Sequence, residues 1–377
     1  MLELYVRYHA EAEKDPSLDD TARAWFVKIE QGDEEALSIF TLFKDMTLKE
    51  VMGVYDLLGI KFDSYAGESF YNDKMAPVVD SLKEKGLLKE DKGAYIVDLS
   101  EENMAPCMIL KSDGSSLYAT RDIAAALYRK ATYDFAKCLY VVAYQQNLHF
   151  RQWFKVVEKM GYDWHKDLEH VAFGMVSLAD GGTLSTRKGN VVLLTDVLSS
   201  AIERAKVIIE EKSPNLAEKE KVAEQVGVGA VVFGVLYNAR IKDIAFSYDR
   251  ALSFEGETAP YMQYTHARCG SVLNKAGDIS AAPDYSALNN EFAMGVLKAM
   301  VGYKEALLEA VNKNEPYLVA RAVMEIAKAY NRFYYEVRII DDADPGATAA
   351  RLMLTRAAKD VLCTGLGILG IAAPERM

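Results

Sequence analysis

The sequence predicts an α/β region followed by an all-α region, and three observations support this fold class. In residues 1–105, apolar side chains spaced by three and four positions indicate amphipathic helices. In residues 106–200, short apolar runs alternate with helical segments, which is typical of a parallel, doubly wound sheet. From residue 201 onward helical patterns dominate, so the remainder is predicted to be a helical bundle.

The composition is that of a globular protein with more than one core. Of 377 residues, 50% are hydrophobic and 26% are charged. No apolar run approaches the roughly 20 residues that cross a bilayer, and the charged first segment is unlike a signal peptide. We therefore predict a cytoplasmic protein with no membrane partner.

The acidic charge is concentrated at one end of the chain. The net charge is -11, and residues 1–105 carry 12 Lys+Arg against 23 Asp+Glu, which leaves 32 against 32 elsewhere. Because phosphate contacts supply much of the affinity for nucleic acids, composition alone does not predict an RNA partner.

The cysteines do not suggest a metal cage or a disulfide framework. They lie far apart without a C-x-x-C pair, so we predict buried, reduced thiols and no structural metal. The four are Cys107, Cys138, Cys269 and Cys363.

In residues 1–105 we expect a helical insertion with a small sheet. Asp19 and Asp33 are candidate N-caps of its helices. A turn around residues 91–93 precedes an apolar run that suits a short strand.

Residues 106–200 contain about three strand candidates, which is few for a complete nucleotide-binding sheet. They are the runs at 107–110, 137–144 and 170–178, separated by helices and by turns at 112–114 and 180–182. The run at 137–144 is apolar on both faces, as in the buried centre of a parallel sheet. Half of the sheet is therefore expected to be missing. Farther along, residues 281–283 and 341–346 are predicted interhelix loops.

A loop after the last strand candidate places hydroxyls, two cations and a glycine within a few residues. Its sequence is Leu184-Ser185-Thr186-Arg187-Lys188-Gly189-Asn190. Such groups stabilise the charge that develops on a leaving pyrophosphate, although a solvated basic turn has the same composition.

Tyr118 and Asp122 lie four residues apart at the start of a predicted helix, where they can share one side. A carboxylate and an aromatic side chain together suit a guanidinium group. Alternatively, Thr120 caps the helix and Asp122 complements its dipole.

Polar residues 144–149 follow the apolar strand at 137–144, which is where open α/β sheets bind ligands. The next strand candidate contains Gly174, which permits close approach of a ligand, although the residues alone favour core packing for this strand. In residues 254–268, tyrosines near a helix start suit stacking on unpaired bases, although tyrosines at helical spacing more often belong to a core.

These segments together resemble the motifs of class I arginyl-tRNA synthetases, over essentially the whole chain. Residues 184–189 resemble the M-S-T-R-K-G form of the KMSKS loop, with Leu184 in place of Met and Thr186 in place of the second lysine. Residues 118–122 resemble Y-x-T-R-D, and residues 145–149 resemble Q-Q-x-L-H. Residues 254–268 and the terminal P-E-R-M resemble the start and the end of the anticodon-binding domain.

The resemblance implies four groups of site residues. The catalytic loop comprises Ser185, Thr186, Arg187, Lys188 and Gly189. The arginine-binding residues are Tyr118, Asp122 and Gln146. The ATP-binding residues are His149, Gly174, Met175 and Val176. The tRNA-binding residues are Tyr261, Tyr264, Arg268 and Met377.

The resemblance further implies an arginine–tRNA ligase with four segments. Residues 1–105 are the insertion, 106–200 the second half of a Rossmann-like fold, 201–250 a helical stem-contact linker and 251–377 the anticodon-binding bundle. The implied partners are arginine, tRNA(Arg) and ATP, the last a substrate with Mg²⁺. No tightly bound cofactor is implied, and the full-length protein is expected to be monomeric.

One motif of the family is absent from this sequence. None of the five histidines forms the class I His-x-Gly-His motif, so we expect an N-terminally truncated, inactive portion. A non-catalytic tRNA-binding module is the alternative. A class I synthetase for cysteine or lysine is disfavoured by Tyr118 and Asp122.

Overall fold

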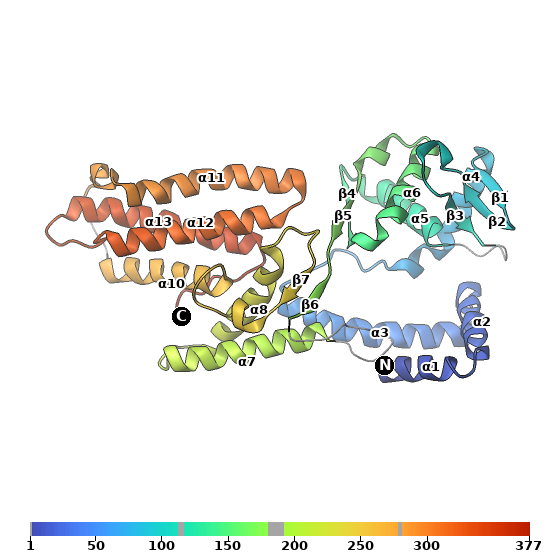
Figure 1. Ribbon diagram of the computed structural model, residues 1–377, viewed down its shortest axis with the longest axis horizontal. Helices are drawn as coiled ribbons and strands as arrows, with labels where there is room; N and C mark the ends of the chain where they lie inside the picture. Colours follow the sequence, from blue (N-terminus) through green and yellow to red (C-terminus); the bar gives the residue numbers. More distant parts are fainter. Residues whose placement is uncertain (1, 112–116, 180–191, 278–280) are drawn as a thin grey trace. The chain divides into compact units, whose positions relative to one another are not determined.

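The computed structural model describes residues 2–111, 117–179, 192–277 and 281–377. The chain forms two compact units (Figure 1). One comprises Met1–Ala24, Ser38–Lys61 and Val176–Met377, and the other comprises Trp25–Leu37 and Phe62–Met175. The predicted turns at 112–114 and 180–182 and the loop residues 185–189 lie outside the described residues.

The first helices are α1 (Leu2–Ala12), α2 (Ser17–Gln31) and α3 (Glu34–Leu57). The predicted cap of α3 is confirmed, because the Ala36 amide donates to Asp33 Oδ1 at 3.0 Å. The prediction for Asp19 is wrong. Asp19 lies inside α2 and accepts a hydrogen bond from the Tyr8 hydroxyl, while Asp15 receives the Ser17 amide at 3.0 Å.

The unit that contains residues 62–175 is an α/β structure. Its elements are η1 (Glu68–Lys74), α4 (Met75–Glu84), β1 (Leu88–Asp91), β2 (Ala94–Val97), η2 (Ser100–Glu102), β3 (Cys107–Leu110), α5 (Tyr118–Tyr133), β4 (Cys138–Ala143), η3 (Tyr144–Gln146), α6 (Asn147–Lys159), η4 (Asp163–Asp167) and β5 (Leu168–Phe173). The predicted turn is confirmed: Lys92 and Gly93 have φ of 49° and 82°, as a two-residue hairpin loop requires.

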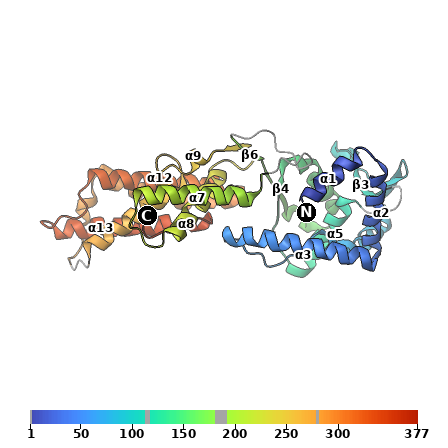
Figure 2. The same cartoon turned by 90° about the horizontal axis from the view of Figure 1, so that it is seen from below.

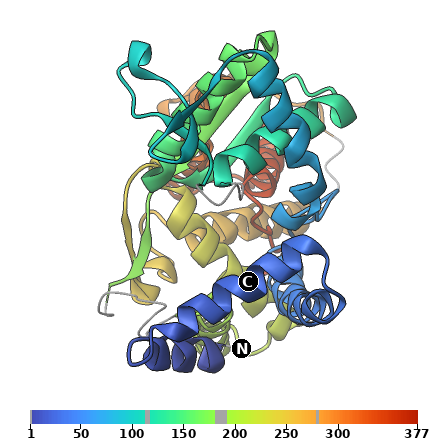
Figure 3. The same ribbon diagram turned by 90° about the vertical axis from the view of Figure 1, so that its right-hand side faces the viewer.

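The strands of this unit form two sheets. Strands β1, β2 and β3 are antiparallel, and β4 pairs in parallel with β5, against which α6 packs (Figure 3). The expectation that 107–110 joins the parallel sheet is therefore wrong. Cys107 and Ile109 are buried while Met108 is exposed, and this alternation is typical of an antiparallel strand with one covered face.

The unit that contains residues 176–377 is mainly helical, as predicted. Its elements are β6 (Val176–Leu178), α7 (Leu194–Lys212), α8 (Lys219–Leu236), β7 (Ile244–Phe246), α9 (Tyr248–Ala251), α10 (Ala259–Ala276), η6 (Tyr285–Leu288), α11 (Glu291–Lys313), α12 (Pro316–Glu336) and α13 (Pro345–Ile368). Both predicted loops, 281–283 and 341–346, fall between helices, although Pro345 already begins α13.

One strand of this unit contradicts the expectation of helices alone after residue 201. Strand β7 pairs in parallel with β6, and its three residues are too few to show a period in the sequence. Helices α7 and α8 lie against each other (Figure 2). A Cβ at Gly227 would lie 2.7 Å from the Ile202 backbone, so this close approach requires glycine.

The cysteines are all free, but only Cys107 and Cys269 are buried, so the expectation is wrong for the exposed Cys363 and only partly met at Cys138. Among the described residues, no helix is long and apolar enough to cross a membrane. The same residues contain no cluster of three or more His, Cys, Asp or Glu side chains that could hold a metal ion.

Candidate functional site

The carboxyl ends of β4 and β5 lie side by side, because Ala143 pairs in register with Phe173. The residues that follow each strand therefore leave the sheet at the same edge, where ligands bind in open α/β sheets. Gln146 ends η3 directly after β4 and is exposed, and Gly174 directly follows β5 and is buried.

At this edge the structure pairs two predicted site residues. Asp122 lies near the start of α5 and His149 in the first turn of α6, and His149 Nε2 is 2.6 Å from Asp122 Oδ2. The Asp122 and His149 side chains are 35% and 27% exposed, so a ligand can reach both. The resemblance assigns these residues to different substrates, and their spacing in the sequence gave no sign of the contact.

The start of α5 is fixed by a buried hydrogen bond. The proposed cap role of Thr120 is wrong, because the N-cap residue is Leu117 and the Thr120 hydroxyl instead donates to the Ile109 carbonyl at 2.5 Å. This bond ties α5 to β3. Tyr118 opens the helix with 69% of its surface exposed, one turn before Asp122.

The Asp122 carboxylate also acts on a buried thiol beside it. The neighbouring Cys107 thiol has its pKa raised to about 12 by burial and by the Asp122 carboxylate, so the thiol stays neutral. Arg121 forms an ion pair with Glu68 at 3.2 Å. The site therefore keeps a carboxylate that can bind a cationic substrate.

The remaining residues predicted to bind ATP do not form one continuous strand, which corrects the expectation for 170–178. Gly174 and Met175 lie in a break between β5 and β6, and Val176 begins β6 in the other compact unit. Met175 and Val176 are both exposed. The residues predicted to contact phosphate, Ser185 to Gly189, lie outside the described part of the chain.

A second candidate site lies on α10, α12 and the chain end. The Arg268 guanidinium is 4.9 Å from the Tyr264 ring centroid, 4.8 Å from that of Tyr334 and 5.5 Å from that of Tyr335, and it donates to Asn331. Two adjoining pockets of about 1040 and 460 Å³ surround this cluster.

All four residues predicted to bind tRNA meet here. Tyr261, Tyr264, Arg268 and Met377 line the smaller pocket. The cation Lys212 lines both pockets, and the larger one adds Lys275 and Arg376. Tyr334 and Tyr335 were missed, because in the sequence they are part of a strongly amphipathic helix. Tyr335 is nevertheless 75% exposed, which no helical period indicates.

Two other polar residues of α10 hold the chain end. Gln263 Nε2 donates to the carbonyls of Gln225 and Ala372 at 3.0 and 2.8 Å. His266 is buried, and its Nδ1 lies 3.0 Å from the Pro374 carbonyl. Burial lowers the pKa of His266 despite the opposing charge of Glu375. These contacts are structural, and they fix the segment that ends in Met377.

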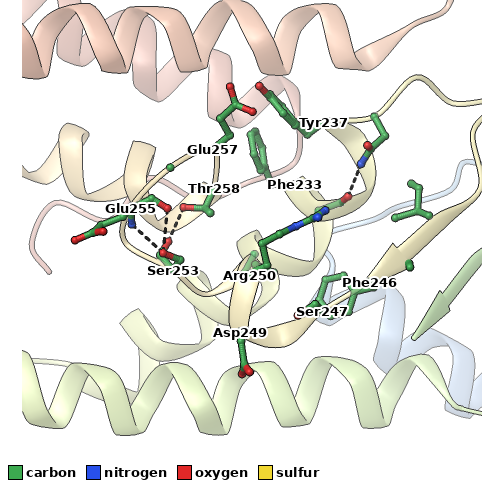
Figure 4. A pocket seen from close by; sticks show the side chains of 17 residues that line it. Phe233, Tyr237, Phe246, Ser247, Asp249, Arg250, Ser253, Glu255, Glu257 and Thr258 are labelled. Atoms are coloured by element: carbon green, nitrogen blue, oxygen red, sulfur yellow. Dashed lines mark hydrogen bonds between the residues drawn. The ribbon is translucent and has the colours of Figure 1, made fainter. Parts of the chain in front are cut away.

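A further pocket of about 580 Å³ lies between α8, β7 and the loop before α10 (Figure 4). Three carboxylates and one guanidinium line it, so its charge does not favour phosphate. Asp249 points toward α7, where Arg204 pairs with it at 3.0 Å. The Lys328 ammonium, followed by the Tyr237 hydroxyl, lowers the pKa of Glu257. We assign no ligand to this pocket.

Two family matches cover most of the chain. Residues 1–248 match the family described as tRNA synthetases class I (R), catalytic domain, and residues 262–377 match the DALR anticodon binding domain.

Similar curated proteins include the arginine–tRNA ligase of Alkaliphilus metalliredigens, 54% identical over 379 residues, and that of Clostridioides difficile, 55% identical over 378 residues. Each alignment covers 100% of this chain and 66% of the relative, so the chain spans slightly under two thirds of their length.

Among solved structures, the arginyl-tRNA synthetase of Thermus thermophilus has a TM-score of 0.82 at 26% identity, over 99% of this chain and 69% of that one. That of Plasmodium falciparum has a TM-score of 0.80 at 23% identity, over 96% and 62%, and shares the fold. The predicted fold class is confirmed by these matches.

Proposed function

Because this chain belongs to the family of class I arginyl-tRNA synthetases, we propose that it takes part in joining arginine to tRNA(Arg). In the first step an oxygen of the arginine carboxylate attacks the α-phosphorus of ATP, and pyrophosphate leaves. In the second step a hydroxyl of the terminal tRNA ribose attacks the arginyl carbonyl, and AMP leaves. The predicted division at residues 105, 200 and 250 remains part of this proposal, as do the monomeric state and the cytoplasmic location.

The observation that carries the proposal is the Asp122 carboxylate at the carboxyl edge of the parallel strands. A guanidinium is bound best by a carboxylate that accepts two parallel hydrogen bonds. Asp122 is partly exposed, and the exposed ring of Tyr118 lies one helical turn before it. Gln146 extends the same edge with an amide that can bind the polar parts of arginine.

For the nucleotide, we propose that Gly174 and Met175 lie against adenine, with Val176 beside them. Gly174 has no side chain to block the approach of a flat ring. Arg187 and Lys188 are proposed to contact the phosphates of ATP, which would enter as its magnesium complex, with Ser185, Thr186 and Gly189 completing the loop. This part of the proposal rests on the motif in the sequence.

For the RNA, we propose that the cluster around Arg268 binds the anticodon arm. Unpaired bases are recognised by stacking on aromatic side chains, and Tyr264 and Tyr335 both expose their rings beside a cation. The cations Lys212, Lys275 and Arg376 at the larger pocket can contact the phosphates of the RNA.

Arginine-dependent exchange between ATP and pyrophosphate tests the activity directly, with and without tRNA(Arg). Exchange with arginine and none with citrulline, whose neutral ureido group cannot pair with Asp122, would support this activity and contradict the inactivity that the missing His-x-Gly-His motif predicts. Asp122→Asn should abolish this preference, and Asp163→Asn, in η4 of the same unit, serves as the matched control. A protein that binds tRNA(Arg) but shows no exchange would instead support the non-catalytic tRNA-binding module.

A further inference from the structure

We propose that His149 is a positioning residue for arginine recognition, which acts by holding the Asp122 carboxylate and not by contacting the nucleotide. This inference deepens the proposed function and rests on it. It reassigns His149 from the ATP site, where the motif resemblance alone had placed it.

The first argument is the geometry of the pair. Nε2 of His149 and Oδ2 of Asp122 are 2.6 Å apart, a short separation for a hydrogen bond to a carboxylate. The edge of the parallel sheet brings α6 to the start of α5, so the imidazole meets the carboxylate that the guanidinium would need.

The second argument is that both helices are anchored to the same strand region. Thr120 ties α5 to the Ile109 carbonyl of β3. On α6, Gln152 Nε2 donates to the carbonyls of Ala105 and Pro106 at 2.9 and 3.1 Å, just before β3. The imidazole therefore holds the carboxylate from a helix that is itself anchored. Because the carboxylate is already ordered, arginine binding has a lower entropic cost.

The third argument is the number of acceptor sites. A carboxylate offers about four lone-pair positions, and the contact with His149 Nε2 occupies one of them on Oδ2. Two positions on Oδ1 and one on Oδ2 then remain, which is enough for the two parallel hydrogen bonds of a guanidinium. His149 therefore fixes the plane of the carboxylate and leaves free the lone-pair positions that would accept hydrogen bonds from the guanidinium.

The test compares His149→Ala with His149→Gln, whose amide nitrogen can reach toward the position of Nε2. We expect His149→Ala to raise the arginine KM about 10-fold, as for loss of one hydrogen bond to a charged group, and to leave the ATP KM unchanged. His149→Gln should restore most of the arginine affinity.

A double-mutant cycle separates positioning from general structure. If His149 acts through Asp122, His149→Ala should have little further effect on the arginine KM in an Asp122→Asn background. The matched control is His165→Ala, because His165 also faces a carboxylate, Glu158 at 3.8 Å, with a side chain 32% exposed, in the same unit. It should change neither constant.

Two results would overturn the inference while leaving the proposed function intact. One is a raised ATP KM with an unchanged arginine KM in His149→Ala, which would mean direct nucleotide contact. The other is full additivity in the cycle. Failure of the unsubstituted protein to bind arginine by calorimetry would overturn the proposed function itself.

Discussion

At the scale of single residues, Arg268 shows why a cation can organise an RNA-binding surface in an acidic protein. Its guanidinium lies within 5.5 Å of three tyrosine ring centroids and donates to Asn331. Asn331 is itself held by donating to the Thr265 hydroxyl at 2.8 Å. Because the guanidinium is planar and fixed, it holds the rings of Tyr264 and Tyr335 in place where bases could stack.

We therefore expect Tyr335→Ala to weaken tRNA(Arg) binding about 10-fold, the effect of losing one base stacked on an aromatic ring. Arg268→Lys should weaken binding as well, because an ammonium keeps the charge but not the flat surface. Fluorescence anisotropy with labelled tRNA measures both. Tyr285→Ala, an exposed tyrosine of η6 outside these pockets, is the control. Unchanged affinity in both variants would mean that tRNA(Arg) does not bind at this surface.

At the scale of secondary-structure elements, the sequence predicted what local patterns encode. Helical periods located the main helices, and Lys92-Gly93 marked the hairpin, because both depend on residues close in the chain. The partner of β3, the three-residue β7 and the break between β5 and β6 depend on distant segments. The same limit applies to the site: motifs identified Asp122 and His149 singly, but only folding brings them together.

The link between α5 and β3 leads to a stability prediction. Thr120→Val keeps the shape of the side chain but removes one of the two hydrogen bonds that the buried Ile109 carbonyl accepts, the other coming from the Leu117 amide at 3.1 Å. This loss should lower the free energy of unfolding by about 0.5–1.5 kcal/mol. Urea denaturation measures this effect. Thr364→Val is the control, because its hydroxyl bonds to Asp360 within an exposed part of α13. Equal losses in the two variants would contradict the role of the buried link.

The attachment of the chain end to α10 should depend on pH. The pKa of His266 is lowered in the folded state by burial, so unfolding takes up a proton at mildly acidic pH. The stability is thus fully present above the pKa of an unfolded histidine, about 6.5, and is lost as pH falls through the lower pKa of folded His266. His266→Asn can still donate to the Pro374 carbonyl but has no titrating ring. In this variant the thermal unfolding midpoint should depend less on pH. An unchanged slope would assign the pH dependence to other groups.

At the scale of the whole molecule, the overall charge and the local cations have different consequences for RNA binding. The acidic excess lies in residues 1–105, and the rest of the chain is balanced. Long-range attraction of RNA is therefore weak, and affinity must come from cations gathered locally. Lys212, Arg268, Lys275 and Arg376 form such a group around one pair of adjoining pockets.

Salt dependence tests this view. Each phosphate that a lysine neutralises contributes about -0.7 to -0.9 to the slope of log affinity against log salt concentration. We expect Lys275→Ala to make the slope for tRNA(Arg) shallower by about that amount, because its ammonium lies at the pocket and pairs with no described carboxylate. Lys313→Ala should leave the slope unchanged, because Glu309 on α11 already pairs with that lysine at 2.6 Å. A slope that is insensitive to Lys275 would mean that the phosphates of the tRNA lie on another face.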